Sequence, residues 1–126
     1  MGKRQVLIRA GGAAIRARLL ETPTADSIWR TLPIYSSVEA WGCAVLFETH
    51  AEAGREATAK ACVEAGEIAF QCDDDRIVIA YGRTPTSKPG EMRLPSPCNI
   101  WAVALDPVAQ LASVRPGESV AVIAVE

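Results

Sequence analysis

Apolar and polar residues alternate in short runs along most of the chain, which is the pattern of half-buried β-strands. In the clearest case Ile15, Ala17 and Leu19 alternate with Arg16 and Arg18. A strand of this kind turns its aliphatic side chains to a core and its guanidinium groups to water. The pattern therefore favours antiparallel sheet with one wet face.

The predicted strands come in pairs joined by turn residues. Gly11 and Gly12 can supply the positive φ angles of a tight hairpin turn, and Asp73 to Asp75 form a second acidic turn. The last strand is apolar on both faces and must be covered on each side. The eight expected strands are Gln5–Ala10, Ala13–Leu20, Ile34–Glu39, Cys43–Glu48, Glu67–Gln71, Arg76–Tyr81, Asn99–Leu105 and Ser119–Val125.

Helical periodicity is confined to short segments. Thr22 can cap a helix that starts with Pro23 and stops at Pro33. One apolar stripe of this helix is formed by Ala25, Ile28, Trp29 and Leu32. The same combination of cap and proline at Asp106-Pro107 predicts a second short helix through Leu111.

Two stretches are harder to interpret. Residues 50–65 are rich in Ala, Glu, Arg and Lys, which favours a helix ended by Gly66, but Gly54 interrupts them and no apolar stripe forms. Helix and loop both stay open there. Residues 82–98 contain four prolines and are expected to form a long loop, a kind of segment that is often functional.

Eight strands and two short helices predict one mainly β domain over residues 1–126. The expected architecture is a closed eight-stranded antiparallel β-barrel with the helices capping its ends, because closure protects strand edges. The chain has 126 residues, of which 49% are hydrophobic and 22% charged. This hydrophobic fraction is enough to form a core and excludes an intrinsically disordered chain.

Charge narrows the classes of partner. The net charge is −2, so binding to nucleic acid is not expected. The distribution is uneven, because residues 31–75 carry nine acidic and two basic side chains.

No apolar run is long enough to span a membrane, and Arg9, Arg16 and Arg18 interrupt any apolar leader, so we expect a cytoplasmic protein.

Metal and cofactor chemistry is not indicated. The four cysteines lack the close pairing of a zinc site, and His50 is the only histidine. The three consecutive aspartates at 73–75 lack the alternating spacing of a calcium loop. We therefore predict no metal, no cofactor and reduced cysteines.

With these elements placed, the chain resembles the small prokaryotic cyclophilin-like proteins, a mostly uncharacterised family with a cyclophilin-type β-barrel. The resemblance begins at Val6 and covers nearly the whole chain. It implies an eight-stranded barrel with two capping helices, and it favours a loop at 50–65. It is carried by the capped helix leading to Leu32-Pro33 and by the segments 38–42 (VEAWG), 63–70 (VEAGEIAF), 81–87 (YGRTPTS), 95–100 (PSPCNI) and 114–120 (VRPGESV).

The prolyl isomerase activity of true cyclophilins is not supported by the residues. Those enzymes use an arginine beside a pocket of phenylalanines with a glutamine, a tryptophan and a histidine. Here the only phenylalanines are Phe47 and Phe70, no Phe-x-x-Gln run occurs, and no motif assigns the catalytic arginine. Robust isomerase activity is therefore not expected, and the catalytic residues stay unknown.

A ligand site is predicted where Arg83 and Thr84 follow the end of a strand. The guanidinium could bind a carboxylate, and the aromatic rings could line an apolar pocket. The alternative is that Thr84, Thr86 and Ser87 only stabilise a turn. The predicted ligand-binding residues are Tyr35, Trp41, Tyr81, Arg83, Thr84 and Asn99.

Three classes of function follow. The first is a small-molecule or peptide binding module. The second is a weak enzyme, either a prolyl isomerase or a hydrolase in which Glu48 and His50 share a strand face near Ser87. The third is a homodimer or partner subunit that associates through an apolar rim.

Overall fold

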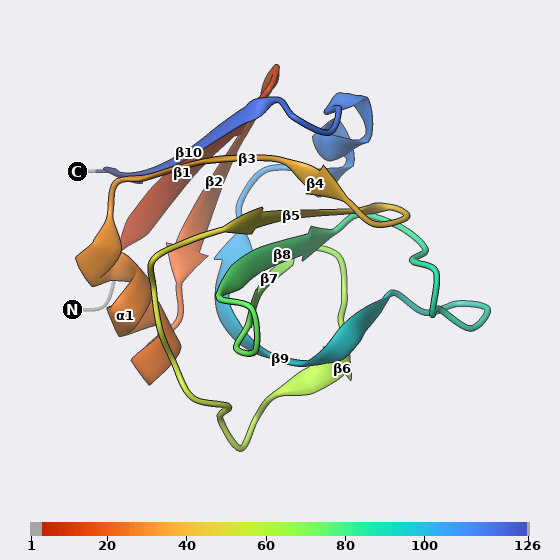
Figure 1. The fold of residues 1–126 in the computed structure, drawn as a ribbon, viewed down its shortest axis with the longest axis horizontal. Coiled ribbons are helices and arrows are strands. Elements are labelled where there is room, and N and C mark those ends of the chain that lie inside the picture. Colours follow the sequence, from red (N-terminus) through yellow and green to blue (C-terminus); the bar gives the residue numbers. More distant parts are fainter. Residues whose placement is uncertain (1–3, 126) are drawn as a thin grey trace.

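The structure is a computed structural model that describes residues 4–125, and it is built mainly from antiparallel strands (Figure 1). Between those residues it contains ten strands, one α-helix and one 3₁₀ helix. The strands are β1 (Gln5–Ala10), β2 (Ala13–Leu19), β3 (Ile34–Ser37), β4 (Glu39–Ala40), β5 (Ala44–Glu48), β6 (Lys60–Cys62), β7 (Glu67–Gln71), β8 (Arg76–Ala80), β9 (Arg93–Ala104) and β10 (Ser119–Val125). The helices are α1 (Pro23–Thr31) and the 3₁₀ helix Val108–Ser113.

Hydrogen bonds connect the strands in the order β3-β10-β1-β2-β9-β7-β8-β5-β4, and β6 pairs with β9 outside this path. The mainly β prediction is confirmed, whereas the closed eight-stranded barrel is not. Val38 divides the expected strand 34–39 into β3, which pairs with β10, and β4, which pairs with β5. That division and the additional strand β6 raise the number from eight to ten, and the sheet remains open between β3 and the end of β5.

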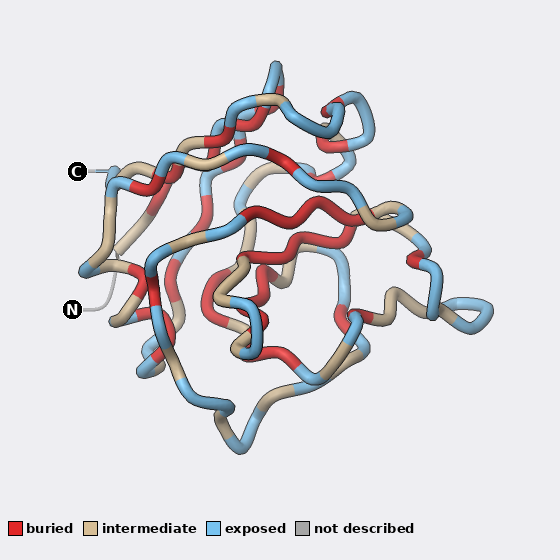
Figure 2. Tube along the Cα trace, in the orientation of Figure 1, coloured by how far each residue is buried: buried red, intermediate tan, exposed pale blue. Residues whose placement is uncertain are grey.

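The sheet is buried on both faces over part of its area (Figure 2). The inner face packs a large cluster around the fully buried Trp101, Phe47 and Phe70. The outer face of β5, β7 and β8 carries a second apolar cluster, which is covered by Val63 and Leu94 from the segments of β6 and β9. Burial on both faces explains why these three strands read as nearly continuous apolar runs.

The predicted first helix is confirmed. The hydroxyl oxygen of Thr22 accepts a hydrogen bond from the Ala25 N–H at 3.1 Å, and Pro23 occupies the first turn, where its missing N–H costs nothing. Ala25 and Ile28 are buried against the inner core, with Trp29 packed beside them. Helix α1 therefore covers one side of the sheet with the predicted stripe.

The structure decides the segment that the sequence left open and shortens the expected loop 82–98. Residues 50–65 form an extended loop that ends in β6 rather than a helix, as the resemblance favoured. The expected loop 82–98 ends at residue 92, because β9 begins at Arg93 and includes Pro95 and Pro97. The prolines are tolerated because β6 is the one described strand that pairs with this half of β9, through an irregular register that does not require every N–H.

The second helix is displaced from its predicted position. It is a 3₁₀ helix that starts at Val108, without a side-chain cap. Asp106 instead accepts hydrogen bonds from the Arg16 backbone N–H (2.9 Å) and from the Arg16 guanidinium at 3.1 and 3.0 Å. These bonds hold the pKa of Asp106 at about 2, below the usual aspartate range. No helix between residues 4 and 125 has the length and apolar character to cross a membrane.

Candidate functional site

Four of the six predicted site residues lie together around one turn. Trp41 and Gly42 connect β4 to β5, and the Cys43 N–H donates to the Arg83 carbonyl at 2.8 Å. The Tyr81 N–H donates to the Cys43 carbonyl at 2.8 Å. A Cβ on Gly42 would lie 2.7 Å from Pro85 Cδ, so the turn packs tightly on the segment after β8.

The side chains at this turn do not all face the same surroundings. Trp41 is half-buried against the outer apolar cluster, whereas Tyr81 packs against the inner core. Burial and the neighbouring Cys43 raise the pKa of the Tyr81 phenol. The Arg83 side chain is exposed. The turn thus offers a free guanidinium, but the two aromatic rings belong to different packing clusters.

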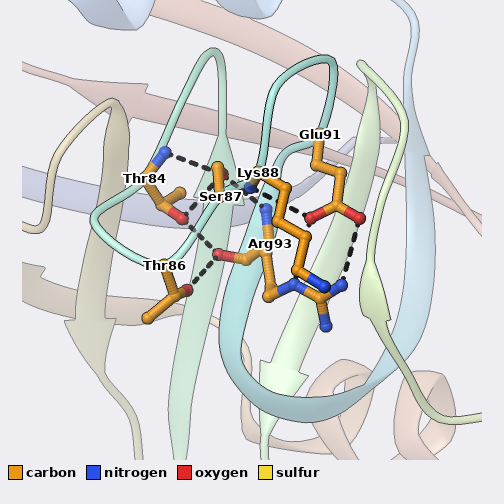
Figure 3. Close-up of polar contacts among 6 residues, drawn as sticks. All are labelled: Thr84, Thr86, Ser87, Lys88, Glu91 and Arg93. Atoms are coloured by element: carbon orange, nitrogen blue, oxygen red, sulfur yellow. Dashed lines mark hydrogen bonds and ion pairs between the residues drawn. The ribbon is translucent and has the colours of Figure 1, made fainter.

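Thr84 is buried within a hydrogen-bonded loop (Figure 3). Its N–H donates to the Ser87 hydroxyl oxygen at 3.0 Å, and its own hydroxyl donates to the Arg93 carbonyl. The Arg93 N–H donates to Ser87 at 2.9 Å, and Thr86 also donates to the Arg93 carbonyl. The geometry therefore matches the turn interpretation of these hydroxyls.

Asn99 belongs to a different polar cluster on the side covered by α1. It is fully buried, and its Nδ2 donates to Thr24 Oγ1 at 2.8 Å and to the Gly54 carbonyl at 2.9 Å. Its Oδ1 accepts from the Glu56 N–H at 2.8 Å, while the Glu56 carboxylate accepts from the Thr24 N–H and hydroxyl. Asn99, which the sequence suggested as a ligand-binding residue, thus fixes residues 54–56 against the start of α1.

Tyr35 lies away from both groups and is 73% exposed. It stands at a cavity of about 350 Å³ between β3 and the end of β5. Its walls are formed by Thr31, Pro33, Ile34, Tyr35, Ser36, Glu48, Thr49 and His50. Of the six predicted site residues, only Tyr35 is part of this cavity.

The cavity brings together a phenol, a carboxylate and an imidazole, from Tyr35, Glu48 and His50. The Glu48 carboxylate is exposed and accepts a long hydrogen bond of 3.3 Å from Arg76 Nη2. The sequence did place Glu48 and His50 on one face, because they are two residues apart. Ser87, the third member of the hydrolase hypothesis, is not among the residues that line the cavity.

Within residues 4–125, no group of three or more His, Cys, Asp or Glu side chains is arranged to hold a metal ion. All four cysteines are free thiols. Cys98 is buried, which raises its pKa to about 11, and Cys62 is exposed.

Comparison with known proteins agrees with the fold and the motifs. A family model described as Cyclophilin-like matches residues 4–123. A hypothetical protein from Archaeoglobus fulgidus, solved in solution, is similar with a TM-score of 0.82 and 31% sequence identity, over 98% of this chain and 96% of that chain. No curated protein matches. Because the family match spans nearly all of the sequence, this chain belongs to the cyclophilin-like family.

Proposed function

We propose that this protein is a binding module for a small molecule or peptide, and that its ligand site is the cavity between β3 and the end of β5. The observation that carries the proposal is the convergence of Tyr35, Glu48 and His50 on one hollow of about 350 Å³. This volume is at the lower end of the range for ligand sites. An aromatic body with a few convergent polar groups is the usual composition of such sites.

Charge favours a cationic or donor-rich ligand. The Glu48 carboxylate is an acceptor, and its guanidinium partner Arg76 is also bound by Glu39 and Asp74. The three acidic groups around one guanidinium leave an excess of negative charge beside the cavity. The exposed Tyr35 ring adds a π-face that attracts cations. A ligand with an ammonium or guanidinium group therefore fits this site best.

The turn at Trp41 is the second candidate position, and the exposed guanidinium of Arg83 supports it. The guanidinium would bind a carboxylate ligand, whose negative charge is opposite to that of the cationic ligand expected at the cavity. We assign Thr84 and Asn99 structural roles, because their polar atoms are engaged within the protein. The two positions thus make opposite predictions about ligand charge.

Titration of ¹⁵N-labelled protein with n-butylammonium or n-butyrate, at equal ionic strength, tests the proposal. We expect the amine to shift the amide signals of Tyr35, Ser36 and His50. Glu48→Gln should abolish these shifts, and Arg83→Ala should leave them unchanged. The outcome that contradicts the proposal is an absence of shifts at the cavity with the amine. Butyrate shifts that Arg83→Ala removes would place the ligand at the turn instead.

A protease-coupled assay on a proline-containing chromogenic peptide addresses the enzyme alternative. With a binding module that lacks isomerase activity, cis–trans exchange keeps its uncatalysed time constant of roughly tens to hundreds of seconds. Catalysis that Arg83→Ala removes would instead support the enzyme alternative.

A further inference from the structure

Among the strands that residues 4–125 form, β3 pairs along one edge only, with β10. Antiparallel strands exchange backbone hydrogen bonds at every second residue pair. The Val38 N–H donates to the Glu118 carbonyl at 2.9 Å, which places the bonded positions of β3 at Ser36 and Ile34. Tyr35 therefore directs its N–H and C=O away from β10. These two groups lie on the side of the cavity.

The end of β5 likewise has one edge that no other described strand pairs with. The Thr49 N–H donates to the Asp75 carbonyl at 3.0 Å, so the odd-numbered residues of β5 bond to β8. Glu48 must then direct its N–H and C=O to the other side. That side faces β3 across the cavity, because residues from both strands line it.

The ladder that joins the two segments stops short of these residues. The Trp41 N–H donates to the Ala44 carbonyl at 3.0 Å, and the pairing between β4 and β5 ends at Glu39 and Leu46. In the part of the chain that the structure describes, no backbone bond continues this ladder into β3.

If the register continued, Ser37 would lie opposite Glu48 and Tyr35 opposite His50. Instead the strands diverge, and the cavity occupies the place of the missing pairs. Figure 1 shows β3 and the end of β5 separating toward α1. The rise per residue, the distance between strands and the distance between packed sheets give roughly 160 Å³ for one residue of a strand. A cavity of about 350 Å³ thus holds about two residues of extended chain.

We propose that this opening between β3 and β5, here called the seam, binds the end of an extended peptide as an added strand. The peptide backbone pairs with Tyr35 and Glu48, and a lysine or arginine side chain of the peptide lies beside the Glu48 carboxylate. The inference rests on the proposed function and names its ligand class. A peptide supplies alternating donors and acceptors at strand spacing, which is what two facing free edges require.

The experiment uses three probes: acetyl-Val-Lys-Val-amide, the same peptide with N-methylated backbone amides, and acetyl-Val-Glu-Val-amide. Binding is followed by ¹⁵N spectra and by amide hydrogen exchange. We expect only the first peptide to slow exchange of the Tyr35 and Glu48 amides. The methylated peptide keeps the charge but lacks the donors, and the acidic peptide keeps the donors but repels Glu48.

Two variants of one residue isolate the backbone contribution. Tyr35→Ala removes the ring, while Tyr35→Pro removes the ring and the N–H that faces the seam. Proline is compatible with an edge strand when its N–H has no partner in the sheet. We expect the proline variant to bind the lysine peptide about fivefold more weakly than the alanine variant. Thermal unfolding verifies that both variants fold, and the methylated peptide keeps the test decisive if the proline variant does not.

The outcomes separate this inference from the proposed function. Equal binding of the lysine peptide and its methylated form, without slowed exchange, overturns the added strand and leaves a cation site in place. Absence of binding by n-butylammonium and by all three peptides overturns both. Protection of the Tyr35 and Glu48 amides without peptide, together with a dimer mass at high concentration, shows that a second copy occupies the seam and overturns the peptide proposal.

Discussion

The polar cluster around Asn99 gives a quantitative prediction for stability. In the variant Asn99→Ala, the Glu56 N–H and the Gly54 carbonyl lose their side-chain partner, whereas Thr24 Oγ1 still donates to the Glu56 carboxylate. Each partly buried backbone group left without a partner costs ~1–3 kcal/mol. Two such groups give a loss of about 3 kcal/mol in the free energy of unfolding.

Thermal and urea unfolding measure this loss. The unfolding entropy expected for a domain of this length converts about 3 kcal/mol into a decrease of about 11 °C in the melting temperature. Hydrogen exchange should also show that the amides of residues 54–56 open before those of the sheet, because the loop is held by this cluster. The matched control is Gln110→Ala, whose side chain makes two exposed hydrogen bonds: it accepts from the Ala14 N–H at 3.3 Å and donates to the Pro107 carbonyl at 3.0 Å. It should change the unfolding free energy by less than about 0.5 kcal/mol.

A decrease of less than about 1 kcal/mol for Asn99→Ala would refute this reasoning, since water would then replace the amide without penalty. Loss of protection throughout the sheet at the same rate as at 54–56 would refute the local role of the cluster.

Three further predictions use other parts of the fold. Gly42→Ala should lose more than about 2 kcal/mol of stability in urea unfolding, because the position has a φ of 59° and its Cβ would meet Pro85 at 2.7 Å. The control Gly12→Ala, with open space around it, should change the free energy of unfolding by less than about 1 kcal/mol. The lowered pKa of Asp106 stabilises the fold above the unfolded aspartate pKa, and this contribution disappears as the pH falls from about 4 to 2. The free energy of unfolding should therefore depend less on pH in Asp106→Asn across that range, and identical pH profiles of the two proteins would contradict the assignment. Iodoacetamide at pH 8 should label the exposed Cys62 first and leave Cys98 unlabelled until unfolding, because burial and a pKa of about 11 keep the Cys98 thiol protonated. Peptide mass spectrometry measures the order of labelling, and early labelling of Cys98 would show that its site opens.

The positions of strands could be predicted from the sequence where one face of the strand is exposed to solvent. The alternation of Ile15 and Ala17 with Arg16 predicted which face of β2 is buried, and the structure confirms it. The proline-rich start of β9 could not be predicted in this way. Pro95 and Pro97 argue against a strand in general, and the tertiary structure is needed to show that β6 is the single described neighbour of this half of β9.

The candidate site was less accessible to sequence reasoning. Glu48 and His50 were placed on one face by their spacing, but the opposite wall comes from Tyr35, thirteen residues earlier in the chain. The sheet order that brings these strands together depends on β10 and β8, which local patterns do not encode. Asn99 was predicted as a ligand-binding residue, and its structural partners at 54–56 lie in a segment whose composition favoured a helix.

The pairing of β3 with β10 also affects how the chain folds during its synthesis. Ser37 pairs with Ser119, which the ribosome adds 82 residues later. At a translation rate of about 5–20 residues per second, β3 waits roughly 4–16 s for its partner, although the β1–β2 hairpin and α1 can form at once. During this interval a nascent chain exposes an unpaired strand, so holding by a chaperone at residues 34–40 should raise the yield of native protein.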